Sequence, residues 1–208
     1  MAVHCPCTKV HTPRRVVVTG GPGAGKTALL ELVRQALCQH VRILPESAGV
    51  VFGGGFPRED DPVCRGAAQR AIYHVQRELE VVGDAHRPAS TQRRRPCPGR
   101  TGRWPGEAAD FWSSLGTEER LELARYDAVI HLRTPPPGRG YNHRNPLRTE
   151  TPAAAAEIDA RILQAWADHP RRFVVESSAR FLGKATRAIE ILHGELPGCC
   201  LHGPALDP

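Results

Sequence analysis

Lysine, methionine and aromatic residues are scarce in this chain of 208 residues. It has three lysines against 25 arginines, a single methionine, and aromatic residues at 5% of the total. So few aromatic residues argue against a nucleic-acid module that stacks bases on interleaved aromatic side chains. No uninterrupted apolar run approaches the ~20 residues of a membrane-spanning helix, so we expect no membrane span.

The start of the chain lacks the apolar segment of a signal peptide, which indicates a cytoplasmic protein. The seven cysteines are an odd number, and this favours free thiols over a disulfide framework. Histidines and cysteines cluster within residues 1–13, but their spacing is too tight for the usual zinc pattern. We therefore predict a flexible leader over 1–13.

The chain does contain a complete phosphate-binding loop. Residues 20–27 read GGPGAGKT and directly follow the apolar run Val16–Val18, which gives the order strand, glycine-rich turn, helix. Glycines let successive backbone N–H groups converge on phosphate oxygens, and the first turn of the next helix adds further donors. Lys26 is predicted to reach the β- and γ-phosphates, and Thr27 to place a hydroxyl on Mg²⁺. The expected nucleotide-binding residues are Gly20, Gly21, Pro22, Gly23, Ala24, Gly25, Lys26 and Thr27.

Hydrophobic periodicity predicts strands alternating with helices. Strands are expected at 15–19, 41–44, 127–132 and 172–176. Helices are expected at 26–38, 64–82, 107–126 with a break at Gly116, from Pro152 after a capping Thr151, and at 179–192. Residues 50–62 are expected to form a loop. This order predicts an α/β fold of the P-loop, kinase-like type, with three layers and a mostly parallel sheet, in a single domain over 14–196 followed by a tail at 197–208.

One strand of such a fold is missing from the pattern. It should lie between the helices near 82 and 107, where residues 84–106 hold four prolines, six arginines and no apolar run. We expect this irregular segment to be an exposed loop that cannot supply a central strand, with the sheet one strand short or filled by a substitute segment. The acidic metal ligand of that strand would then be absent.

The net charge of +6 concentrates in two runs without acidic residues, 86–103 and 128–149. A polyanionic small molecule such as a nucleotide explains the second run better than nucleic acid does. Nucleic-acid binding through Arg93–Arg95 is the weaker alternative.

Taken together, these segments resemble small bacterial AAA-type ATP/GTP-binding proteins related to the nicotinamide-riboside-kinase-like P-loop proteins. The resemblance runs over most of residues 15–200 and rests on VVVTGGPGAGKT, LPESAGVVFGGGFPR, ARYDAVIHLRTP, GYNHRNPLRTE and ELPGCC. It departs at Cys97, where the family has a strand ending in an acidic segment. Two explanations stay open: this segment has diverged, or it is read out of frame between two intact flanks.

The resemblance adds weight to residues outside the loop. Glu46 ends the second strand and is expected to accept a substrate hydroxyl proton or position water. Arg139, Arg144 and Arg148 lie in a proline- and glycine-flanked loop, and a lid of arginines there would stabilise transferring phosphates, with Arg148 the foremost candidate.

Other polar residues favour plainer interpretations. Asp127 is expected to be a turn residue, and Asp60 and Asp61 to be solvated loop acids. Gln69, Gln76 and Glu80 share a helix face that is expected to be solvated rather than to contact a substrate.

The sequence thus predicts an ATP- or GTP-binding protein that needs Mg²⁺. Its reaction would be phosphoryl transfer to a small molecule or hydrolysis of the nucleotide, with Lys26, Glu46, Arg144 and Arg148 as catalytic residues and Thr27 on the metal. The alternative is a catalytically impaired nucleotide-binding module that lacks the acidic metal ligand.

Overall fold

The computed structural model describes residues 12–38, 40–85, 90–94, 108–136, 151–178 and 180–197. In chain order its elements are β1 (Arg15–Thr19), α1 (Lys26–Ala36), β2 (Val41–Leu44), α2 (Ser47–Gly53), α3 (Pro62–Ala85), β3 (Ser90–Arg94), α5 (Ala108–Ser114), α6 (Glu119–Leu123), β4 (Ala128–Leu132), α7 (Pro152–Ala165), β5 (Arg172–Val175) and α8 (Phe181–Glu195). The first two predicted strands have the bounds expected from the sequence, and the other two agree within one residue at each end.

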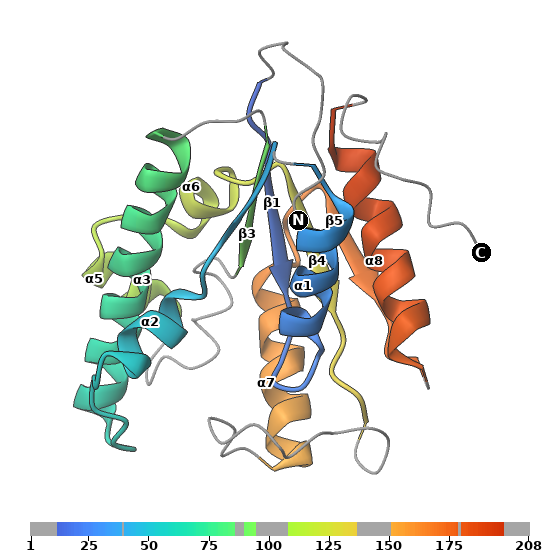
Figure 1. Ribbon diagram of the computed structural model, residues 1–208. Helices are drawn as coiled ribbons and strands as arrows, with labels where there is room; N and C mark the ends of the chain where they lie inside the picture. Colours follow the sequence, from blue (N-terminus) through green and yellow to red (C-terminus); the bar gives the residue numbers. More distant parts are fainter. Residues whose placement is uncertain are drawn as a thin grey trace.

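The five strands form one sheet in the order β2-β3-β1-β4-β5, and every neighbouring pair is parallel. All strands therefore end at the same edge, and the chain leaves β1 toward one side of the sheet and reaches β4 on the other. Figure 1 shows α2 and α3 on the side of β2 and α8 on the side of β5. The expected α/β P-loop fold is confirmed. In open parallel sheets ligands bind where the strand order reverses, beyond the carboxyl ends of the strands, which here is beside β1.

The central position between β2 and β1 is filled, contrary to one expectation from the sequence. Residues 90–94, with the sequence STQRR, pair with β1 on one side and with β2 on the other. The prediction that 84–106 cannot supply a central strand is wrong at these residues, and the substitute segment is what the structure contains. The physical reason is that a parallel ladder is made by main-chain groups, whose burial without partners is costly whatever the side chains are. This strand brings no carboxylate.

The sheet is covered on both faces, which confirms the three layers. Val16 and Val18 belong to an apolar cluster with α1 and α8, whereas Val17 packs with Ile162 of α7 and with Trp166, which directly follows α7. The three valines of β1 are at most 1% exposed. A strand buried on both faces reads as a continuous apolar run, and this is why β1 was recognisable from sequence.

Two expectations about the region after β2 are wrong. Residues 50–53 belong to helix α2 and not to a loop, because Ala48 and Val51 pack against Ile72 of α3 and this packing outweighs the glycines. The face of α3 that carries Gln69 and Gln76 is buried, at 4% and 1% exposure, and is not solvated.

Local signals elsewhere are confirmed. The helix pattern of 107–126 divides into α5 and α6 at Gly116, whose φ of 66° is left-handed. Thr151 caps α7 by accepting a hydrogen bond from the Ala154 N–H, with Pro152 in the first turn.

Among the described cysteines, Cys38 and Cys64 are free thiols. None of the helices described is both long and apolar enough to cross a bilayer.

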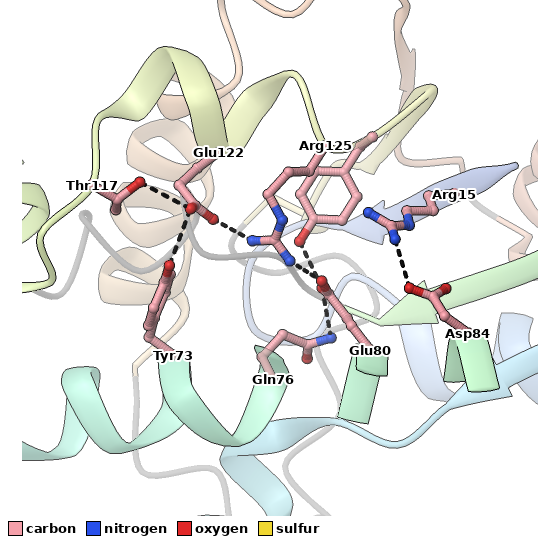
Figure 2. Close-up of polar contacts among 9 residues, drawn as sticks. Arg15, Tyr73, Gln76, Glu80, Asp84, Thr117, Glu122 and Arg125 are labelled. Carbon is pink, nitrogen blue, oxygen red and sulfur yellow. Dashed lines mark hydrogen bonds and ion pairs between the residues drawn. The ribbon is translucent and has the colours of Figure 1, made fainter. Parts of the chain in front are cut away.

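A buried ionic network joins α3 to α6 at the amino-terminal end of the strands (Figure 2). Arg125, just before β4, forms ion pairs with Glu80 of α3 and Glu122 of α6. Glu80 also accepts from Gln76 and from the Tyr126 hydroxyl, while Glu122 accepts from Tyr73 and Thr117. The two carboxylates are only 3% and 4% exposed, and the Arg125 guanidinium offsets part of their charge where water has little access.

We predict that Arg125→Met lowers the free energy of unfolding by about 3–5 kcal/mol, because it removes the guanidinium that pairs with two buried carboxylates. Chemical denaturation measures this change. The control is Arg34→Met, which removes an arginine paired with Glu31 where both side chains are more than half exposed; its effect should stay within about 0.5 kcal/mol. Equal effects of the two substitutions would contradict a structural role for the network.

Candidate functional site

The glycine-rich loop lies at the carboxyl end of β1, where it turns into α1. Gly20, Gly23 and Gly25 have φ angles of 136°, 77° and 89°, which residues with a Cβ rarely adopt. Gly20 is required for a second reason, since a Cβ there would lie 2.1 Å from the Leu132 carbonyl oxygen. The loop is therefore pressed against the end of β4, and only glycine permits that approach.

Helix α1 begins at Lys26 with no side chain capping its first turn and no acidic residue in that turn. Its first N–H groups thus have no intrahelical acceptors, and the positive end of the helix dipole lies at the loop. These two features together make a binding place for an anion such as a phosphate.

Lys26 folds back over the loop that precedes it. Its side chain is buried, and Nζ donates to the carbonyl oxygens of Gly20 at 2.8 Å and Gly21 at 2.6 Å. Thr27, the next residue, is exposed. The structure thus brings together the loop, the ammonium group and the hydroxyl that the sequence predicted as one site.

Asp159 of α7 supports the loop from outside. Its Oδ1 accepts the Gly21 N–H at 2.8 Å and lies 3.0 Å from His131 Nε2, while Oδ2 pairs with Arg133 at 3.0 Å. Burial alone would raise the pKa of Asp159, but the interactions with His131 and with the N–H groups of Gly21 and Thr134 outweigh it and hold the pKa below its ordinary 3.8. Asp159 is therefore a buried carboxylate that stays ionised.

Two further side chains hold the same loop. The Thr134 hydroxyl donates to the Pro22 carbonyl at 3.0 Å, and Lys184 Nζ of α8 donates to the Ala24 carbonyl at 2.9 Å. Lys184 also donates to the Arg133 carbonyl at the end of β4. Side chains from three distant parts of the chain therefore form hydrogen bonds with every second peptide group of one short loop.

Glu46 lies at the same edge of the sheet as the loop. It follows β2, occupies the position before α2 without a capping hydrogen bond from its side chain, and is half-buried. Since β2 is two strands away from β1, the two strand ends are roughly 10 Å apart. The catalytic role of Glu46 stays a prediction.

The remaining predicted residues lie elsewhere. Arg139, Arg144 and Arg148 fall outside the described residues. Asp127 lies at the opposite end of the sheet, where its carboxylate accepts the Arg15 N–H, which agrees with a structural role.

Asp61 sits at the start of α3 and accepts the N–H groups of Val63 and Cys64. Ligand atoms of Glu59, Asp61 and Cys64 lie within 4.8 Å of one another. The hydrogen bond to Asp61 raises the pKa of the Cys64 thiol to about 11, so this sulfur keeps its proton and is a poor metal ligand.

Sequence reasoning missed three residues that hold the loop, Thr134, Asp159 and Lys184, and also His131, which pairs with Asp159. One signal was available, because Lys184 is one of only three lysines in an arginine-rich chain, as Lys26 is. Asp159 gave no signal of its own, since its N–H partner lies 138 residues earlier.

Comparison with known proteins identifies the fold. A scan against protein-family models finds no match, and a search of curated protein sequences finds none either. Among solved structures, the NadR protein in complex with NR has a TM-score of 0.66 at 16% identity, covering 95% of this chain and 55% of that one. The chain thus spans about half the length of that NadR chain.

Two kinases are similar over most of their own length. Deoxyadenosine kinase from M. mycoides with bound dATP has a TM-score of 0.58 at 12% identity, covering 86% of this chain and 99% of that one. Thymidylate kinase from Candida albicans has a TM-score of 0.60 at 12% identity, with 88% and 92% covered. At these identities the likeness shows the fold alone, and it supports the kinase-like part of the resemblance and not the AAA part.

We predict that Asp159→Asn lowers the free energy of unfolding by about 2–3 kcal/mol at pH 7, the usual contribution of a hydrogen bond to a charged group. Because the pKa of Asp159 is lower in the folded protein, its contribution is complete above 3.8 and disappears as the pH falls through the folded value. Urea denaturation of both proteins between pH 7 and pH 3 should therefore show a difference that narrows at the acid end.

The control is Asp168→Asn, an exposed aspartate beyond the end of the same helix. It should change stability little at any pH. A difference between Asp159→Asn and the unaltered protein that stays constant down to pH 3 would show that the carboxylate charge does not support the fold.

Proposed function

We propose that this protein binds ATP or GTP at residues 20–27 and transfers the terminal phosphoryl group to a small molecule or to water. The observation that carries this proposal is the loop itself: three left-handed glycines, an uncapped helix start and a buried ammonium group in one place. In this proposal the loop N–H groups and Lys26 bind the phosphate oxygens and stabilise charge on them in the transition state.

The donor set near the loop fits Mg²⁺. The exposed Thr27 hydroxyl is an oxygen ligand of the kind that this ion prefers, and Mg²⁺ usually takes few protein ligands besides phosphates and water. When bound, it would neutralise charge on the phosphate oxygens. The protein's own part is to position Thr27 at the start of α1.

Glu46 is proposed to bind the hydroxyl of the acceptor and to take its proton. Glu46 follows the end of β2, at the edge of the sheet that also carries the loop, and a carboxylate there could act as the general base. The names of two structural neighbours support a nucleoside or nucleotide as acceptor, since they are a deoxyadenosine kinase and a thymidylate kinase. The lid arginines Arg144 and Arg148 would complete the site.

A second candidate is nucleotide binding without turnover. It is favoured by one observation, which is that residues 85–106, including all of β3, contain no aspartate or glutamate. Turnover measured in saturating MgATP or MgGTP, beside binding measured alone, separates the two candidates. The domain bounds 14–196 and the cytoplasmic location stay predictions of the sequence.

A thermal-shift panel of nucleotides and nucleosides tests the proposal directly. A ligand at 100 times its dissociation constant stabilises the folded protein by about 2.7 kcal/mol, which a melting curve detects. No shift with any nucleoside triphosphate would contradict nucleotide binding.

We predict that Lys26→Ala weakens the binding of ATP and GTP by about 100-fold or more, because the ammonium group nearest the loop is lost. Isothermal titration calorimetry measures the affinity. Lys9→Ala is the control, since it removes a lysine of the predicted leader and should leave affinity unchanged. Equal affinity of Lys26→Ala and the unaltered protein would exclude the loop as the nucleotide site.

Arg148→Ala is predicted to lower turnover by about 100-fold or more, the usual effect of removing one donor to transition-state charge, and to leave the melting temperature nearly unchanged. Arg161→Ala serves as the control, because Arg161 is an exposed arginine of α7. A large loss of stability with normal turnover would assign Arg148 to the fold instead.

A further inference from the structure

Lys184 is a buried cation that reaches the loop from the other end of the sequence. It lies in the first turn of α8, is 5% exposed, and its Nζ donates to the carbonyls of Ala24 and Arg133. The first acceptor is in the loop and the second is at the end of β4. One ammonium group thus ties the loop to the sheet.

Burying an ammonium group at this position costs desolvation free energy, so its presence needs a reason. Burial lowers the pKa of Lys184 from 10.5 to about 8, even though Asp159 and Glu176 act to raise it. An apolar side chain would fill the same space without this cost. Arginine, used for almost every other basic residue here, has a planar fork, whereas a single ammonium nitrogen donates to two carbonyls from different elements.

The hydrogen bond to Ala24 fixes more than one atom. The Ala24 carbonyl and the Gly25 N–H belong to the same planar trans peptide, so they point in opposite directions. Holding the carbonyl outward against α8 therefore directs the Gly25 N–H inward, where α1 begins. The same geometry recurs at Pro22, whose carbonyl is held outward by Thr134.

Asp159 also holds a peptide group of the loop, but it accepts from an N–H group where Thr134 and Lys184 donate to carbonyl oxygens. It holds the Gly21 N–H outward, and the Gly20 carbonyl of the same peptide accepts from Lys26 inside the loop. Outer side chains thus decide which main-chain group each peptide presents to the interior of the loop.

We propose that Lys184 is a positioning residue of the nucleotide site, which aims the Gly25 N–H at a phosphate by holding the Ala24 carbonyl on α8. The inference rests on the proposed function, since it assigns Lys184 a part in phosphate binding. Lys184 touches no phosphate itself and acts through the peptide group.

The charge of Lys184 gives the proposal a signature in pH. Asp159 on α7 and Glu176 after β5 act on its ammonium group, and Asp159 is itself paired with His131 and Arg133 of the β4 side. Above about pH 8 Lys184 loses its proton, and a neutral amine donates more weakly than an ammonium group. Nucleotide affinity should therefore fall as the pH passes 8.

The contribution of Lys184 to fold stability has the opposite sign. Between its folded value of about 8 and its ordinary 10.5 the unfolded chain holds the extra proton, so this contribution rises with pH. A lysine that served only the fold would change the stability with pH but would leave nucleotide affinity unchanged between pH 7 and pH 9.

The experiment measures MgATP and MgGTP affinity by calorimetry at pH 7 and pH 9 for four proteins: the unaltered chain, Lys26→Ala, Lys184→Met and Arg187→Met. Arg187 is the matched control, because it is a cation of the same helix, 66% exposed and paired with Glu190. We expect Lys184→Met to weaken binding about tenfold at pH 7, the size of one charge-assisted hydrogen bond. Its affinity should lose less between pH 7 and pH 9 than that of the unaltered chain, and Arg187→Met should match the unaltered chain.

Amide hydrogen exchange supplies a second measurement. Positioning predicts faster exchange confined to residues 20–27 in Lys184→Met, whereas a role in the fold alone predicts faster exchange throughout.

Each outcome decides one of the two ideas. Normal affinity and unchanged exchange in Lys184→Met, while Lys26→Ala loses binding, overturns the role of Lys184 and leaves the proposed function standing. Failure of the unaltered chain to bind either nucleotide overturns the proposed function. If Lys184→Met does not fold, Lys184→Gln replaces it, and affinity of the unaltered chain that stays constant from pH 7 to pH 9 then overturns the inference.

Discussion

The pairing of main-chain groups is the constraint on which this structure depends. Parallel ladders bring the carboxyl ends of all five strands to one edge, and that edge carries both Glu46 and the glycine-rich loop. The ladder is indifferent to side chains at its centre, as β3 shows with the sequence STQRR between two apolar neighbours. An arrangement set by the backbone survives there although the local sequence does not favour a strand.

Two sets of buried charges among the described residues differ in their partners. At the amino ends of the strands, Arg125 is paired with Glu80 and Glu122, so side chains balance one another. At the carboxyl ends, Lys26, Asp159 and Lys184 bind peptide groups of the loop. The first arrangement joins helices and supports stability. The second uses buried charged side chains to orient individual N–H and C=O groups of the loop. Such orientation serves the binding of a ligand.

How much of this could be read from the sequence depends on the distance between partners. The loop, β1 and the cap at Thr151 are local patterns, and the structure has them where they were predicted. The sequence of strand β3 carries no apolar pattern that would predict a strand. Its position is set instead by main-chain pairing with β1 and β2 on either side. Asp159 and Lys184 act on residues 138 and 160 positions away, so only the fold brings them to the loop. Gln69 and Gln76 were misread for the same reason, since burial by later helices is not visible in their own segment.

The composition of the site separates binding from catalysis. The groups that would hold a phosphate are main-chain N–H groups, Lys26 and Thr27, and all of them lie within residues 20–27. In the proposed function, catalysis would also need a carboxylate for the acceptor hydroxyl and cations for the transferred phosphoryl group, roles that are proposed for Glu46, Arg144 and Arg148. The segment that includes β3 offers no acid to strengthen metal binding. In the proposed function, affinity for a nucleotide depends on residues 20–27, which Thr134, Asp159 and Lys184 hold in place. Turnover would depend on Glu46, Arg144 and Arg148 as well, so a change in one need not alter the other.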